Sequence, residues 1–113
     1  MYKIVTLKID KDCHVDTSLE QEYVRQSIAA LSKHRVRVRW IKATRTMYGR
    51  HYYIQIEPPV DGHTANHLQY LLGDDSKRVS LNQARINSGL EDWDLLFESV
   101  GRKLKTLYSE SAF

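Results

Sequence analysis

Cysteine and long apolar runs are scarce in this sequence of 113 residues. There is one cysteine, Cys13, so no disulfide can form within the chain, and a reducing compartment is expected. The apolar runs, such as Leu95-Leu96-Phe97, are far too short to cross a membrane. The first residues predict a strand and lack the apolar core and cleavage site of a signal peptide. We therefore expect a cytoplasmic protein with no membrane partner.

Sequence motifs of catalysis are also missing. The chain has no Gly-x-Ser-x-Gly elbow for a serine nucleophile and no glycine-rich loop that would hold phosphates. These absences favour a non-catalytic protein. The length and the 42% of hydrophobic residues suit one modest core. One α+β domain over residues 1–113 is therefore expected.

Acidic residues are absent from about a third of the chain. Between Tyr23 and Ile56 there is no Asp or Glu, although eight Lys and Arg residues lie there. The remainder carries nine basic and all fourteen acidic residues, so the net charge of +3 conceals a strongly cationic segment. Segregation of this kind favours an anionic partner such as nucleic acid.

Hydrophobic spacing predicts a ferredoxin-like fold. Strands with period two are expected over residues 2–10, 35–43 and 51–57. Helices are expected over residues 18–33, 64–72 and about 75–88. The order β-α-β-β-α, with an additional C-terminal helix, is typical of a ferredoxin-like antiparallel sheet with its helices on one face. Residues 93–99 fit a helix and a short strand equally well.

Alternation within the strands predicts which side chains face the core. In the first strand, Val5 is expected on the same face as Leu7. In the second strand, Trp40 is expected to face the core with Val38, and the arginines between them to face away.

A basic and aromatic surface is expected on the sheet face that the helices leave free. Guanidinium groups bind phosphates and tyrosine rings stack on bases, as the binding of a single strand requires. The predicted binding residues are Arg35, Arg37, Arg39, Arg45, Tyr48, Arg50 and Tyr53. The leading hypothesis is a non-catalytic nucleic-acid-binding protein, with DNA and RNA as open alternatives. A simpler interpretation is that alternating arginines keep a hairpin soluble.

Acidic residues support two further hypotheses. Asp10 and Asp12, at the end of the first strand, could hold a divalent metal in a nucleotidyl-transfer or nuclease enzyme. They are also typical of a solvated turn before a helix. In the third hypothesis the protein is an oligomerisation module, in which the basic strand pairs with an acidic patch of another copy. That patch consists of Glu91, Asp92 and Asp94.

A pattern in the C-terminal half resembles one in small proteins of archaeal viruses and mobile elements. It consists of Leu71-Leu72-Gly73-Asp74-Asp75-Ser76-Lys77-Arg78-Val79, Arg85 and Trp93-Asp94-Leu95-Leu96-Phe97. The resemblance implies a viral protein that acts in the cytoplasm of its host.

Two other segments faintly resemble the core of archaeo-eukaryotic primases. They are Asp10-x-Asp12 and Gly49-Arg50-His51-Tyr52-Tyr53. In that core, acidic residues bind metal and a strand His contacts the nucleotide. Here Tyr53 stands where that His would fall, His51 is two positions early, and Asn82 stands where similar proteins tend to have Asp. The resemblance therefore implies a nucleic-acid context without a mechanism.

Overall fold

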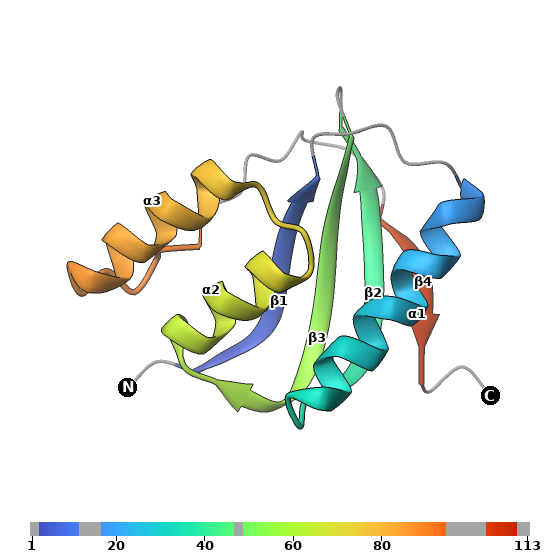
Figure 1. Cartoon of the computed structure of the whole chain (residues 1–113), viewed down its shortest axis with the longest axis horizontal. Helices are drawn as coiled ribbons and strands as arrows, with labels where there is room; N and C mark the ends of the chain where they lie inside the picture. The colour runs from blue at the N-terminus through green and yellow to red at the C-terminus, as the bar shows by residue number, and fades with distance from the viewer. Residues whose placement is uncertain (1–2, 12–16, 47–48, 95–103, 111–113) are drawn as a thin grey trace.

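The fold of the computed structural model is an antiparallel sheet with helices on one face (Figure 1). The structure describes residues 3–11, 17–46, 49–94 and 104–110. The elements in chain order are β1 (Ile4–Lys11), α1 (Thr17–Lys33), β2 (Arg37–Arg45), β3 (Arg50–Val60), α2 (Gly62–Leu71), α3 (Ser76–Asn87) and β4 (Lys105–Ser109). The predicted α+β class, with the helices on one face and an additional helix after α2, is confirmed.

The strand order of the sheet is β1-β3-β2-β4. β3 runs antiparallel to both of its neighbours, so β1 and β2 are parallel to each other and α1 joins them across the helical face. In the usual ferredoxin-like sheet the last strand lies beside β1, whereas here β4 pairs with β2 at the other edge. α2 and α3 lie toward the β1 edge, and α1 lies over β2 and β4 (Figure 1).

The hydrophobic core lies between the sheet and the helices. Leu7, Ile41 and Ile54 of three neighbouring strands are fully buried, and they pack against Leu31 of α1 and Leu68 of α2. Burial of one such side chain contributes about 1.5–3 kcal/mol, so this layer is the main source of stability. The helices therefore cover one face of the sheet and leave the opposite face to polar and aromatic side chains.

The alternation of β2 breaks at Arg39, and the prediction for Trp40 is therefore wrong. Val38 pairs with Ile56 and Trp40 pairs with Gln55, which leaves Arg39 as an extra residue in a β-bulge. A slip of one residue moves every later side chain to the opposite face. The residue after Trp40 is fully buried in the core, and Trp40 itself faces away from the helices.

The predicted faces of β1 are also wrong at its start. The register with β3 shifts just after Ile4, so that Ile4 joins the core while Val5 is 45% exposed. The extra residues belong to β3, which continues through Pro58 and Pro59 to Val60. Proline cannot donate a ladder hydrogen bond and is tolerated at such irregular positions.

The C-terminal strand β4 lies in a part of the chain for which the sequence pattern leaves helix and strand open. Leu104 and Leu107 follow helical spacing, but Lys105–Ser109 pairs with β2. Periodicity is a poor guide here, because a segment of five residues is too short to distinguish the period of a helix from that of a strand. Of residues 93–99, Trp93 and Asp94 belong to neither a helix nor a strand, and the others lie outside the described residues.

Groups from α2, α3 and the turn between them complete the hydrogen bonds on the outer edge of β1. The Lys8 amide donates to Gln69 Oε1 at 3.0 Å, and the Lys8 carbonyl accepts from Arg78 Nη1 at 3.0 Å. The Asp10 amide donates to Asp74 Oδ1 at 2.9 Å, and the Asp10 carbonyl accepts from the amide after Asp74 at 3.1 Å. Both residues therefore have partners for their outward backbone groups, which blocks the edge to a further strand at these two positions.

Arg78 lies at the centre of this sealed edge. Its side chain is 9% exposed and contacts Asp74, which is fully buried, and Asp94, which is 11% exposed. Burial raises the pKa of both carboxyl groups, while the Arg78 charge and several hydrogen bonds act in the opposite direction. The three residues form a buried ionic cluster that binds β1 to the helices.

Candidate nucleic-acid interface

The face of the sheet that points away from the helices carries a row of basic and aromatic residues. Lys8 of β1 and Lys42 of β2 lie opposite Tyr53 on either side. Trp40 lies opposite Gln55 on the same face. Lys8, Tyr53 and Lys42 therefore share this face, and the bulge adds Trp40 to it.

Trp40 and Lys42 are in direct contact. The Lys42 ammonium lies 4.5 Å from the centre of the Trp40 ring, which is within the range of a cation–π interaction. Both side chains are half-buried. Arg37 precedes them on the same face, because it pairs with Glu57 in the ladder. β2 therefore presents an aromatic ring between cations.

Arg37 and Arg39 are bound to two glutamates. Arg37 Nη2 lies 3.1 Å from Glu57 Oε2 and 3.1 Å from Glu110 Oε1. Arg39 lies 2.9 Å from the first carboxylate through Nη1 and 2.5 Å from the second through Nε. Glu57 and Glu110 both lie outside the acid-free segment. The composition of that segment therefore does not reveal that these acids neutralise two of its arginines.

Arg50 and Tyr53 are less accessible than the sequence suggests. Arg50 faces the helices, where its Nε lies 3.3 Å from Glu20 Oε2, and the two side chains are 11% and 9% exposed. The hydroxyl of Tyr52 donates to the same carboxylate at 3.2 Å. Tyr53 is 8% exposed, so its ring offers little area for stacking.

The other predicted binding residues do not join the row on β2. Arg35 lies in the turn before β2, with a φ of 60°, and so is not part of the predicted strand. Arg45 is exposed at the far end of β2. Tyr48 lies outside the described residues. Of the seven predicted residues, Arg37 and Arg39 remain beside Trp40 and contact the same pair of acids.

Asp10 lies opposite His51 in the ladder between β1 and β3. Asp10 Oδ1 is 3.4 Å from His51 Nε2, and His51 is 6% exposed. Asp12 lies outside the described residues. Within the described ranges, no three His, Cys, Asp or Glu side chains form a group that could hold a metal ion. A metal site at Asp10 and Asp12 stays a prediction.

The acidic patch expected to bind another copy is only partly available. Glu91 and Asp92 are exposed, but Asp94 belongs to the buried cluster with Arg78. The oligomerisation hypothesis also stays a prediction.

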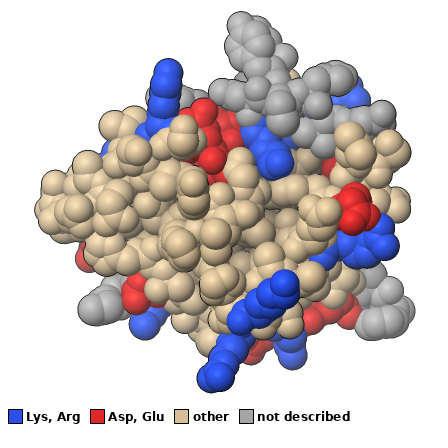
Figure 2. Space-filling model, viewed as in Figure 1, with Lys and Arg blue, Asp and Glu red and all other residues tan. Residues whose placement is uncertain are grey.

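The helical side of the molecule is different in character. Figure 2 shows a broad uncharged surface over α2 and α3, with Lys and Arg side chains toward the rim. α2 contains no Lys, Arg, Asp or Glu residue. The uncharged part of this surface offers no cation to a nucleic-acid backbone.

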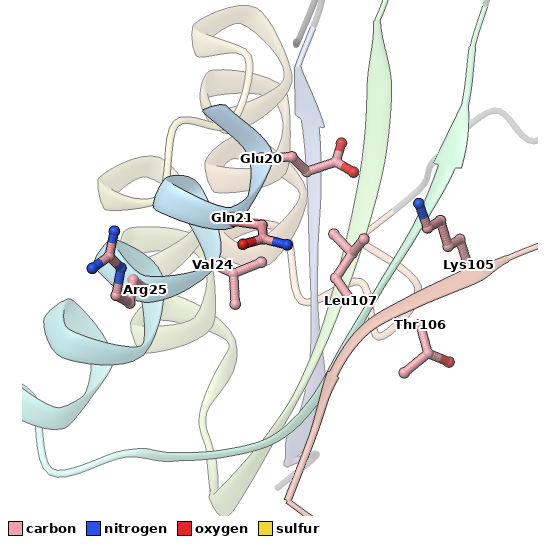
Figure 3. A pocket seen from close by; sticks show the side chains of 7 residues that line it. All are labelled: Glu20, Gln21, Val24, Arg25, Lys105, Thr106 and Leu107. Atoms are coloured by element: carbon pink, nitrogen blue, oxygen red, sulfur yellow. The ribbon is translucent and has the colours of Figure 1, made fainter. Parts of the chain in front are cut away.

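A cleft of about 460 Å³ lies between α1 and β4. Val24 and Leu107 face each other across it, while Arg25 points away from β4 (Figure 3). Glu20 lies in its wall, where Arg50 and the Tyr52 hydroxyl already bind the carboxylate. A carboxylate that is engaged in this way holds α1 to β3 and is a poor candidate for proton transfer.

Comparison with known proteins assigns no family to this geometry. No protein-family model, curated protein or solved structure matches the chain. The resemblances to viral proteins and to the primase core therefore stay predictions. Among the helices that the structure describes, none is long and apolar enough to span a membrane.

Proposed function

We propose that the protein binds nucleic acid without catalysis and that a single strand of DNA or RNA lies along β2. The observation that carries this proposal is the position of Trp40. Because of the bulge at Arg39, the indole faces away from the core and contacts Lys42 on the face that also carries Arg37. An aromatic ring between cations is the arrangement by which proteins bind single strands.

The chemistry of this row favours a single strand over a duplex. The guanidinium groups of Arg37 and Arg39 match the oxygens of a phosphate, and Lys42 adds a point charge. A base must leave its stack to lie on Trp40. The free-energy cost of this step is small in a single strand and roughly a few kcal/mol in a duplex. One stacked base contributes about 1–3 kcal/mol.

Fluorescence anisotropy tests this proposal, with a labelled DNA strand, its duplex and the RNA of the same sequence as probes. We expect the single strands to bind more tightly than the duplex. Their affinity should fall as the salt concentration rises. The slope of log K against log salt should be about −0.7 for each phosphate contact. The variant Trp40→Leu should lose about tenfold or more in affinity, because stacking on the indole is lost.

A matched control is Arg25→Gln, which removes an exposed arginine from α1 on the other side of the sheet. It should retain most of the affinity of the wild type. No binding to any of the three probes at low salt would refute the proposal. Equal losses in Trp40→Leu and Arg25→Gln would show that binding is not located on β2.

A further inference from the structure

Two glutamates on opposite sides of β2 contact its arginines, and we name Glu57 and Glu110 the glutamate clasp. Glu57 belongs to β3 and Glu110 directly follows β4, so the arginines have an acid on either side of their strand. Each glutamate contacts both Arg37 and Arg39, at distances from 2.5 to 3.1 Å. The amide of Glu110 also donates to the Arg39 carbonyl at 3.1 Å, which fixes its place beside the bulge.

The clasp is open to solvent. The side chains of Arg37 and Arg39 are 63% and 44% exposed, and those of Glu57 and Glu110 are 52% and 26% exposed. Ion pairs at such positions add little to folding and weaken with salt. These four charges add little to folding and are in contact with water. The arginines can therefore exchange a glutamate for another anion.

The clasp occupies the groups that a phosphate would use. A carboxylate presents two oxygens to a guanidinium in the same planar, forked geometry as two oxygens of a phosphate. A nucleic-acid strand on β2 therefore competes with Glu57 and Glu110 for Arg37 and Arg39. A bound phosphate would also lie close to both carboxylates, and this repulsion adds to the competition.

We propose that Glu57 and Glu110 are internal competitors that limit the affinity of β2 for nucleic acid. This inference rests on the proposed function of the same strand. Phosphate binding displaces the two carboxylates, and the displaced carboxylates take up cations from solution. The wild type therefore has a weaker affinity and a shallower salt dependence than its cations alone would give.

The test compares the wild type with Glu57→Gln/Glu110→Gln, by anisotropy with a labelled single strand of DNA. Glutamine keeps the shape of the side chain and removes its charge. The double variant should bind about tenfold more tightly, with a steeper salt slope. Each single variant should show part of the gain, and Glu57→Gln leaves the contact of Glu110 with β2 intact.

The control is Glu22→Gln, which has the same net charge as each single clasp variant. Glu22 pairs with Arg25 on α1, which covers the other face of the sheet. Glu22→Gln should stay within about twofold of the wild type, since salt screens the attraction between a distant exposed charge and the bound anion. A gain equal to that of Glu57→Gln or Glu110→Gln would show a general effect of charge and would overturn the inference.

The outcomes separate this inference from the proposed function. If the wild type binds and the clasp variants bind no more tightly, the inference is wrong and the proposed function stands. If the wild type does not bind but the clasp variant does, the proposed function is refuted for the wild type, and the clasp is shown to block β2 completely. If none of the proteins binds at low salt, both ideas are refuted.

Discussion

The molecule contains two clusters of arginine and carboxylate side chains with opposite consequences. Arg78 lies between Asp74 and Asp94, and all three side chains are at most 11% exposed. Arg37 and Arg39 lie within the glutamate clasp, where side-chain exposure runs from 26% to 63%. The same ion-pair chemistry therefore fixes an edge of the sheet in one place and leaves cations exchangeable in the other. Burial decides between the two roles, because it sets the free energy of losing a partner.

The largest expected effect comes from removing the buried cation. Arg78→Met leaves two buried carboxylates without their counter-ion, and the Lys8 carbonyl without a donor. We expect the free energy of unfolding to fall by about 3–5 kcal/mol. Denaturation in urea measures this, with the exposed neighbour Lys77→Met as the control on the same helix. A loss as small as that of the control would remove the distinction between the clusters.

The stability deficit of Arg78→Met should depend on pH, in a direction set by the carboxyl groups of Asp74 and Asp94. Burial already raises the pKa of Asp74 and Asp94, and the variant loses the Arg78 charge, which opposes this rise at both carboxyl groups. A raised pKa in the folded state means that the folded protein binds protons that the unfolded chain does not. The stability deficit of the variant should therefore be largest at neutral pH and should shrink as the pH falls. A deficit that grows in acid would contradict this assignment.

A smaller effect is expected from Gln69→Leu at the same edge. The Gln69 side chain is fully buried, and its Oε1 accepts from the Lys8 amide. Leucine fills most of the space but leaves that amide without a partner, at a cost of about 1–3 kcal/mol. The control Gln83→Leu replaces a more accessible glutamine of α3. Equal melting temperatures for the two variants would mean that water reaches the β1 edge.

The smallest effect on stability is expected at the clasp. Arg37→Gln should lower the free energy of unfolding by less than about 1 kcal/mol, because its two ion pairs are exposed. The same variant should weaken the binding of a single strand clearly and reduce the salt slope by about 0.7. Urea denaturation and anisotropy on one preparation measure both quantities. A large loss of stability would show that the clasp is structural, like the cluster around Arg78.

The sequence predicts the helices and the inner strands well, since their periods extend over many residues. Gly73 directly follows the C-cap residue of α2 and has a φ of 94°, and Asp75 caps α3 by accepting from two amides. The bulge at Arg39 is different, because one extra residue depends on how β2 aligns with β3. Alternation within β2 alone predicts that Trp40 faces the core.

The candidate site was predictable in location and only partly in composition. The acid-free segment correctly indicates β2 as the cationic strand, and Arg37 and Arg39 do face solvent. Nothing in the sequence separates Arg50 from these two arginines. In the structure it faces the helices, because it pairs with Glu20 of α1. The clasp likewise brings together residues 57 and 110, which are far apart in the sequence. The sequence does not predict this contact, because it depends on the edge of the sheet at which β4 pairs.

The sealed edge of β1 has a consequence for assembly. β4 is the outermost described strand at the other edge, so the sheet has one side on which another strand could pair. Two copies joined through β4 would form a continuous sheet that ends in a blocked β1 at both sides. Edge-to-edge growth would then stop at a pair, and this route could not produce a fibre.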